Sequence, residues 1–436
     1  MLLQGACKME IFKKVIYSFN PLKQLLASGG LTFIFRIGGL GLTFLVTLLL
    51  TRLYGDEVFG SYSLVFTIAQ ATSLLFALGF PNALISYLGL KSINDPFSQH
   101  MLQKGIKILV PIALVPACIY FFGANAIALH IFGNPALSSY IIIAAFTIPV
   151  MVLHEFILYF FIATGNFFKF NLFMFVVPNV LLLTLLIFVK DVTGPHTFGL
   201  YFLSIIGVLA IESFFAFKKY KKVVVDEISV SQMIRFASPM MFSGIMIYLL
   251  NWTDVFILGA MATEAELAHY NLAYKIASLS MLVIMSMNVV LAPRIAALYN
   301  EGNMKELHLT VKKTTRLIIV LTLPVVGVLM LLATYILSFF GPEFIAGHKA
   351  LIIILAGFLV NAMTGNVDQL LNMTGNQKLL QYITIAGFFL NAGLNFALIP
   401  QYGINGSAVA SLITNVIFNV TCVFFIKKKL GFYTFA

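Results

Sequence analysis

The sequence predicts an all-α integral membrane protein with twelve transmembrane helices, arranged as two parallel repeats of six. Its 436 residues are 60% hydrophobic and only 10% charged, with a mean hydropathy of +0.99, whereas soluble chains carry about 25% charge. Many apolar runs reach the roughly 20 residues that a helix needs to cross a bilayer core, which favours helices over barrel strands. Short motifs of the first half also recur in the second half.

Twelve apolar runs define the predicted helices. They lie at 27–51, 60–89, 105–126, 139–163, 170–189, 198–217, 236–260, 267–297, 316–339, 349–373, 379–400 and 404–426. The third run is the least regular, because Pro111, Pro116 and Gly123 interrupt it. The Lys-rich start, residues 1–23, has no long uncharged stretch of the kind found in a cleaved signal peptide. We expect this start to lie in the cytoplasm or at the membrane interface.

The distribution of basic residues predicts the orientation in the membrane. In this arrangement 22 Lys and Arg residues fall on one side, and only Arg52, Lys190 and Lys349 fall on the other. Since loops rich in Lys and Arg stay on the cytoplasmic side, both termini are predicted to be cytoplasmic. The net charge of +11 therefore reflects membrane topology, and we expect no nucleic acid partner.

The two halves of the chain resemble two copies of one six-helix unit. Four motif pairs recur in the same order at nearly constant offset: 162–166 with 372–376, 132–133 with 340–341, 60–62 with 268–270, and 198–200 with 402–404. Six is an even number, so both copies would cross the membrane in the same direction, as in transporters with a cleft between parallel repeats. We predict an N-terminal lobe of residues 1–222 and a C-terminal lobe of residues 223–436. The two Thr-Gly-Asn turns are expected to cap helices, because glycine accepts a positive φ.

The first predicted helix carries one polar stripe with an arginine in its middle. The stripe consists of Ser28, Thr32, Arg36, Gly39, Thr43 and Thr47. An arginine near the bilayer centre costs at least about 2.5 to 3.5 kcal/mol to insert, so we expect Arg36 to face a protein interior or a water-filled cavity. The alternative is that Arg36 pairs with a carboxylate and only locks two helices together.

Other ionisable residues lie on polar faces of helices from both halves. The pairs are Glu155 with Tyr159, Asn251 with Asp254, Asn271 with Lys275, and Asn361 with Asp368. Lys275 is either a cavity cation or a side chain that reaches the membrane surface. The carboxylates are candidates for proton or cation coupling, and their alternative role is to join helices.

For three further ionisable residues we expect ordinary structural roles. Glu212 lies near the end of its predicted helix and before Lys218, so we interpret it as a surface charge. His154 and His269 are interpreted as ordinary polar residues of the interior or of loops, in preference to pH switches.

The sequence contains no motif that points to enzyme chemistry. It has no phosphate-binding loop, no zinc-protease motif and no hydrolase nucleophile motif. The cysteines at 7, 118 and 422 have no spacing typical of metal or redox sites. We therefore expect no cofactor and no enzymatic activity, and transport would draw on an ion gradient, the membrane potential or substrate flux.

Several stretches resemble the polysaccharide, or O-antigen, flippases of the multidrug/oligosaccharidyl-lipid/polysaccharide exporter superfamily. The similar stretches are 51–62, 77–80, Asp254, 270–275, Pro293 and 395–410. The resemblance implies a V-shaped, two-lobed transporter that alternates between inward-open and outward-open states. The implied cargo is an oligosaccharide on undecaprenyl pyrophosphate, moved to the outer leaflet of a bacterial inner membrane.

The resemblance also implies roles for particular residues. Arg36 fits a cationic cavity for the pyrophosphate, with Thr32, Asn251 and Lys275 as further substrate-binding candidates. Membrane lipids are expected partners, together with a polysaccharide polymerase and a chain-length regulator. The main alternative is a multidrug or organic-cation antiporter of the same superfamily, which would need an acidic cavity, but residues 27–51 contain no carboxylate. A lipid scramblase-like or assembly protein is a further alternative, which the duplicated halves with polar interior faces disfavour.

The predicted topology can be tested with reporter fusions. Fusions after Lys222 and Lys429 should place the reporter in the cytoplasm, and fusions near Asp191 and Gly341 should place it outside, because of the asymmetry in basic residues. Paired reporters that are active on opposite sides of the membrane provide the control. An external signal after Lys222 would contradict the predicted arrangement.

Overall fold

The computed structural model describes the whole chain except residues 1, 90, 190–191, 193, 218–247 and 436. All regular secondary structure in the described residues is helical. Eight helices of this part are long and apolar enough to cross a membrane. The fold is therefore an all-α, multi-pass membrane architecture, as the sequence predicts.

The described residues of the first half form seven α-helices. They are α1 (Leu2–Phe76), α2 (Phe80–Leu88), α3 (Pro96–Ala126), α4 (Leu137–Ala163), α5 (Phe167–Asn171), α6 (Val177–Phe188) and α7 (His196–Ala216). Short π-helical turns, η1 (Ile127–Ile131) and η2 (Leu172–Val176), extend α3 and join α5 to α6.

In the second half, the described residues start with a helical segment at 248–261. It continues with α9 (Glu264–Ala277), α10 (Leu282–Asn300), α11 (Met304–Leu331), α12 (Ala333–Phe340), α13 (His348–Thr364), α14 (Val367–Met373) and α15 (Gln377–Leu430). Two 3-10 turns, η3 (Ser278–Met281) and η4 (Pro342–Gly347), precede α10 and α13.

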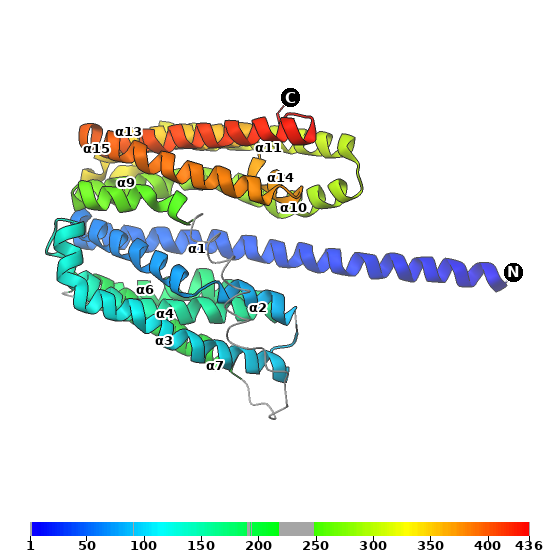
Figure 1. Ribbon diagram of the computed structural model, residues 1–436, viewed down its shortest axis with the longest axis horizontal. Helices are drawn as coiled ribbons and strands as arrows, with labels where there is room; N and C mark the ends of the chain where they lie inside the picture. The colour runs from blue at the N-terminus through cyan, green and yellow to red at the C-terminus, as the bar shows by residue number, and fades with distance from the viewer. Residues whose placement is uncertain (1, 90, 190–191, 193, 218–247, 436) are drawn as a thin grey trace.

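The helices form two groups on either side of α1. Figure 1 shows α2, α3, α4, α6 and α7 on one side of this long helix, and α9 to α15 on the other side. α1 contacts α4 and α6 in the first group and α9 in the second group. The boundary predicted at residue 222 lies outside the described residues.

Two glycines bend helical elements that each join two of the helices predicted from the sequence. α1 is non-helical at Gly55, with φ 81°, and α15 is non-helical at Gly403, with φ 54°. Both values lie in the left-handed region that glycine adopts at little cost. The predicted total of twelve helices stays a prediction, because each of these elements joins two predicted helices and residues 218–247 are not described.

Side-chain caps place several helix starts earlier than the apolar runs predict. Asp95, Thr263 and Asn303 accept hydrogen bonds from the backbone N–H groups three residues later, at 3.1, 3.3 and 3.2 Å. α3 therefore begins at residue 96 and α11 at residue 304, whereas the apolar runs begin at 105 and 316. Apolar runs mark the part of a helix that a bilayer covers, while caps mark where the backbone becomes helical.

The two Thr-Gly-Asn turns have the same geometry in both halves. Gly165 and Gly375 adopt φ of 74° and 77°. In both turns the threonine hydroxyl donates to the carbonyl four residues earlier, at 2.8 and 2.7 Å, and the asparagine amide donates to the threonine carbonyl. The predicted helix-capping role is confirmed.

The bend at Gly403 brings the two parts of α15 into close contact. A Cβ atom on Gly406 would lie 2.4 Å from the backbone oxygen of Leu398, which cannot move away as a flexible side chain could. Ser407 donates a hydrogen bond to Asn395 at 2.7 Å across the same contact. The absence of a side chain at residue 406 therefore sets the distance between the two parts.

A matched pair of glycine substitutions in α15 tests this contact. Gly406→Ala should lower the apparent melting temperature of the purified protein, because the new Cβ overlaps backbone atoms. Gly393→Ala is the control, since a Cβ at residue 393 would meet nothing within 4 Å and alanine favours the helix by up to about 1 kcal/mol. Equal melting temperatures for the two variants would show that the contact at Gly406 is not required.

Candidate functional site

The polar stripe of α1 is partly used to pack this helix against the first group. A Cβ on Gly39 would lie 2.6 Å from the Cβ of Phe175, so the two backbones are very close there. The Thr43 hydroxyl hydrogen-bonds with the carbonyl oxygen of Gly39 and the side-chain oxygen of Asn179, at 2.9 and 3.2 Å. This part of the predicted stripe therefore faces protein.

Lys275 reaches the same stripe from the second group. Its Nζ donates a hydrogen bond of 2.7 Å to the hydroxyl of Thr47 and lies 5.7 Å from the centre of the Phe59 ring. The side chain is half-buried. Lys275 therefore contacts α1 in the interior of the protein, with a neutral hydroxyl as its partner.

Arg36 lies three turns before Thr47 on α1, or about 16 Å along the helix axis. Its side chain is half-buried. Among the described residues, no carboxylate forms an ion pair with Arg36 and no group accepts a hydrogen bond from it. The alternative that Arg36 locks two helices through a carboxylate therefore finds no support in this part of the chain. The predicted neighbour Thr32 has a side chain outside the described residues.

Asp254 lies inside the second group and is only 5% exposed. The Asn395 amide donates to its Oδ1 at 2.7 Å, and the Tyr270 hydroxyl donates to its Oδ2 at 2.5 Å. The Ser411 hydroxyl also donates to Oδ2. Three neutral donors thus surround the carboxylate, and they come from α9 and from both parts of α15.

Asn251 does not share the environment of Asp254. The two residues are three positions apart, yet the Asn251 side chain is exposed while that of Asp254 is buried. The structure therefore exposes one of these two residues and buries the other. A spacing of three residues rotates a helix position by about 60°, which is enough here to give the two side chains different exposure.

The other candidate carboxylates lie apart from Asp254. Glu155 is half-buried on α4 in the first group, and Asp368 is half-buried in the first turn of α14 in the second group. Within the described residues, no three His, Cys, Asp or Glu side chains come together in a way that could hold a metal ion. The structure therefore does not bring the three predicted coupling residues into one site.

The position of Glu212 differs from the prediction. We predicted a surface charge, but Glu212 has no exposed surface and its two carboxylate oxygens lie 3.0 Å from Nδ1 of His154. The pair joins α7 to α4 inside the first group. The signal in the sequence was a single acidic residue within an apolar run, although this signal does not identify the partner.

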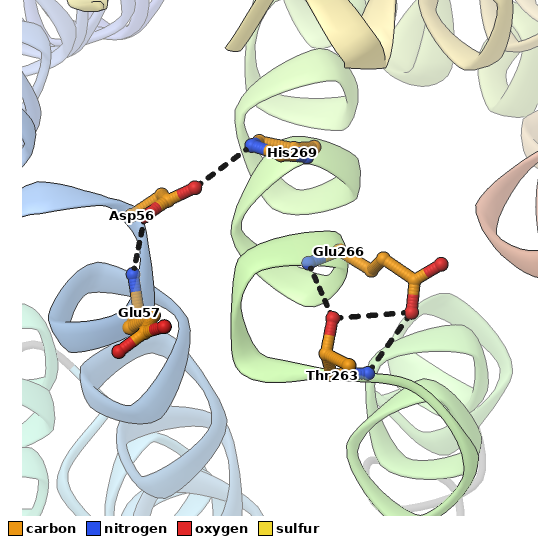
Figure 2. Close-up of polar contacts among 5 residues, drawn as sticks. All are labelled: Asp56, Glu57, Thr263, Glu266 and His269. Carbon is orange, nitrogen blue, oxygen red and sulfur yellow. Dashed lines mark hydrogen bonds and ion pairs between the residues drawn. The ribbon is translucent and has the colours of Figure 1, made fainter. Parts of the chain in front are cut away.

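A set of contacts joins the two groups at the end of the helices predicted to be external. Figure 2 shows Asp56 facing His269, and the Oδ2 and Nε2 atoms lie 3.2 Å apart. Arg52 donates hydrogen bonds to the carbonyl oxygens of Phe339 and Ser338, at 3.0 and 3.2 Å. These contacts link α1 to α9 and α12.

Backbone and aromatic contacts close the same end further. A Cβ on Gly60 would lie 1.9 Å from the carbonyl oxygen of Glu264, so α1 and the start of α9 touch directly. The side chain of Glu264 accepts a hydrogen bond from Asn134, which lies between α3 and α4. The rings of Phe59 and Phe344 are 6.2 Å apart. The described structure is therefore closed between the groups at this end.

Comparison with protein families identifies the class of protein. Residues 25–299 match the family model described as "Polysaccharide biosynthesis protein", and residues 239–397 match the model MatE. The matches indicate a membrane transporter rather than a catalytic enzyme. Because the first model covers more than half of the chain, the protein belongs to the polysaccharide biosynthesis protein family.

One curated relative is similar to part of the chain. The probable low-salt glycan biosynthesis flippase Agl15 of Haloferax volcanii is 25% identical over 171 residues. The matched region covers 38% of this chain and 36% of that protein. The similarity therefore spans about a third of the length of the relative.

Solved structures share the fold over almost the whole chain. An inward-facing multidrug resistance MATE family transporter of the MOP superfamily has a TM-score of 0.75 and 15% identity, covering 92% of this chain and 98% of that one. The lipid II flippase MurJ in an inward closed conformation has a TM-score of 0.74 and 17% identity, covering 92% and 87%. An outward-facing MATE transporter has a TM-score of 0.55 and 14% identity, covering 93% and 95%. The protein thus has the all-α fold of the MOP transporters.

A double-mutant cycle tests the contact between Asp56 and His269. Asp56→Asn and His269→Gln should show a coupling of about 0.5 to 1 kcal/mol in the stability of the purified protein, as expected for a partly exposed pair. Glu57→Gln is the matched control, because Glu57 is the neighbouring carboxylate and points away from His269 in Figure 2. Additive effects of Asp56→Asn and His269→Gln would show that the pair does not contribute.

Proposed function

We propose that this protein is a flippase for lipid-linked oligosaccharides that works by alternating access. The cargo would be a surface polysaccharide repeat unit on undecaprenyl pyrophosphate, such as an O-antigen unit for lipopolysaccharide. It would move from the cytoplasmic leaflet to the outer leaflet of a bacterial inner membrane, with both termini of the protein in the cytoplasm. Membership of the polysaccharide biosynthesis protein family and the similarity to a glycan flippase support this proposal.

The observation that carries the proposal is the half-buried Arg36 within α1, which has no carboxylate partner among the described residues. A diphosphate would compensate this charge, and the planar guanidinium can donate two parallel hydrogen bonds to it. Lys275 of α9 is a second cation at the α1 stripe, where it donates a hydrogen bond to the Thr47 hydroxyl. Because that partner is neutral, Lys275 can exchange it for a phosphate oxygen. Thr32 and Asn251 would supply polar contacts to the sugars or phosphates.

Asp254 is the strongest of the three proposed coupling residues. Its carboxylate is surrounded by neutral donors, so it can accept a proton or a small cation without first breaking an ion pair. Glu155 and Asp368 are proposed as further proton acceptors during the return step. The two lobes, 1–222 and 223–436, would then move relative to each other, and the contacts of Arg52 and Asp56 would have to break in the outward-open state.

The alternative function is a multidrug or organic-cation antiporter of the same superfamily. The fold similarity to MATE transporters favours this alternative. Such a cargo needs negative charge in the pathway, whereas Arg36 of the α1 stripe and Lys275, which contacts that stripe from α9, are cations. We therefore favour an anionic, lipid-linked cargo, with a polymerase and a chain-length regulator as proposed partners downstream.

Reconstitution with defined substrates tests the proposal. Vesicles that contain the protein should flip lipid-linked oligosaccharide, and Arg36→Ala should slow flipping more than about tenfold, since a charge-assisted hydrogen bond contributes about 1.5 to 3 kcal/mol. Arg36→Lys keeps the charge without the planar fork and should give an intermediate rate. Lys349→Gln is the matched control, because it removes an exposed cation on the side of the membrane predicted to be external.

A second substrate in the same vesicles distinguishes the alternative. Exchange of protons for an organic cation, without flipping of any lipid-linked oligosaccharide, would contradict the proposed function. Equal rates for Arg36→Ala and Lys349→Gln, at equal amounts of protein, would remove Arg36 from the binding site.

A further inference from the structure

A cavity of about 420 Å³ lies at one end of the second group, away from the α1 stripe. It is formed by the turn between α14 and α15, by the first turns of α15, and by the last turns of the same element. Its lining residues are Gly375, Asn376, Lys378, Leu379, Tyr382, Phe425, Lys428 and Lys429. Three lysines thus share one cavity.

Among the described residues, no acidic side chain forms an ion pair with these lysines. No acidic residue follows Asp368 in the sequence, so neither end of α15 supplies a carboxylate. Both ion pairs among the described residues involve histidines, and no described group accepts a hydrogen bond from Lys378, Lys428 or Lys429. Within the described part of the chain, the cavity therefore presents three lysines without an acidic partner.

The neighbouring Lys427, in contrast, has interaction partners within the protein. Its Nζ donates a hydrogen bond of 2.8 Å to the carbonyl oxygen of Gly431 and lies 4.9 Å from the centre of the Tyr433 ring. Lys427 does not line the cavity. The tail after α15 thus uses one lysine of the run and leaves the next two for the cavity.

Lys169 is the counterpart of Lys378 in the first half, and its side chain lies over aromatic rings. Lys169 follows the first Thr-Gly-Asn turn as Lys378 follows the second. Its Nζ lies over the rings of Phe215 and Phe161, at 5.0 and 5.8 Å from their centres.

The position of the cavity points to a ligand in the membrane. It lies at the end of an apolar membrane-spanning helix, on the side that carries most basic residues. Tyr382 is 70% exposed and Phe425 is half-buried beside the lysines. Aromatic and basic side chains together at a helix end are typical of the headgroup region of a bilayer.

We propose that this cavity binds the phosphate headgroup of an anionic phospholipid of the cytoplasmic leaflet. The three lysines would bind the phosphate oxygens, and the acyl chains would lie along α15 beside Tyr382 and Phe425. Basic pockets between membrane helices on the cytoplasmic side bind such headgroups through this combination of charge and apolar surface. The site is separate from the pathway proposed for the cargo and does not depend on it.

Native mass spectrometry of the purified protein measures this binding directly. Wild-type protein titrated with phosphatidylglycerol or cardiolipin should retain these lipids more than tenfold better than phosphatidylcholine. The triple variant K378Q/K428Q/K429Q should lose between about tenfold and a hundredfold in affinity, since each lysine near an anionic surface contributes about fivefold. The variant K378R/K428R/K429R keeps the charge and should keep most of the binding.

The matched control removes three lysines from α11 on the same side of the membrane. K305Q/K312Q/K313Q changes the net charge by the same amount as the triple variant of the cavity. It replaces none of the residues that line the cavity. Equal loss of lipid in this control would overturn the proposal in favour of a diffuse charge effect. Competition by inorganic phosphate or pyrophosphate at equal concentration would also overturn it, because the ligand would then be a soluble anion.

Discussion

Every polar group that a membrane-spanning helix buries must find its partner inside the protein, because hydrocarbon offers no hydrogen bonds. Asp254 meets this requirement with three donors that come from α9 and both parts of α15. His154 and Glu212 meet it by joining α4 to α7. Each group of helices is thus tied together by its own buried polar contact, while the groups contact each other at one end and, in the interior, through Lys275 and Thr47 of α1.

Two carboxylates and four cations of the protein differ in their partners. The carboxylates of Asp254 and Glu212 are held by groups of the protein itself. The half-buried Arg36 and the exposed lysines of the cavity beside Tyr382 have no carboxylate partners among the described residues. The proposed cargo pathway and the proposed lipid cavity would both use these cations to bind anions.

Sequence periodicity predicted which residues form polar contacts better than it predicted the partners in those contacts. The fold class, the capping turns and the polar stripe of α1 follow from local patterns. The contacts of Lys275 with Thr47 and of His154 with Glu212 join residues 228 and 58 positions apart. A helical pattern states which side of one helix is polar and does not state which helix lies opposite. Glu212 was misplaced for this reason, and the lysines of the cavity were interpreted only as topology signals.

The close approach of α1 to Phe175 has a consequence for protein engineering. At residue 39 a single added carbon would overlap backbone atoms of the neighbouring helix, while at residues 38 and 41 a Cβ would meet nothing within 4 Å. Position 39 is thus fixed in size, whereas the residues on either side of it can vary in volume. A library that varies side-chain volume along this helix should therefore hold Gly39 constant and diversify Gly38 and Gly41.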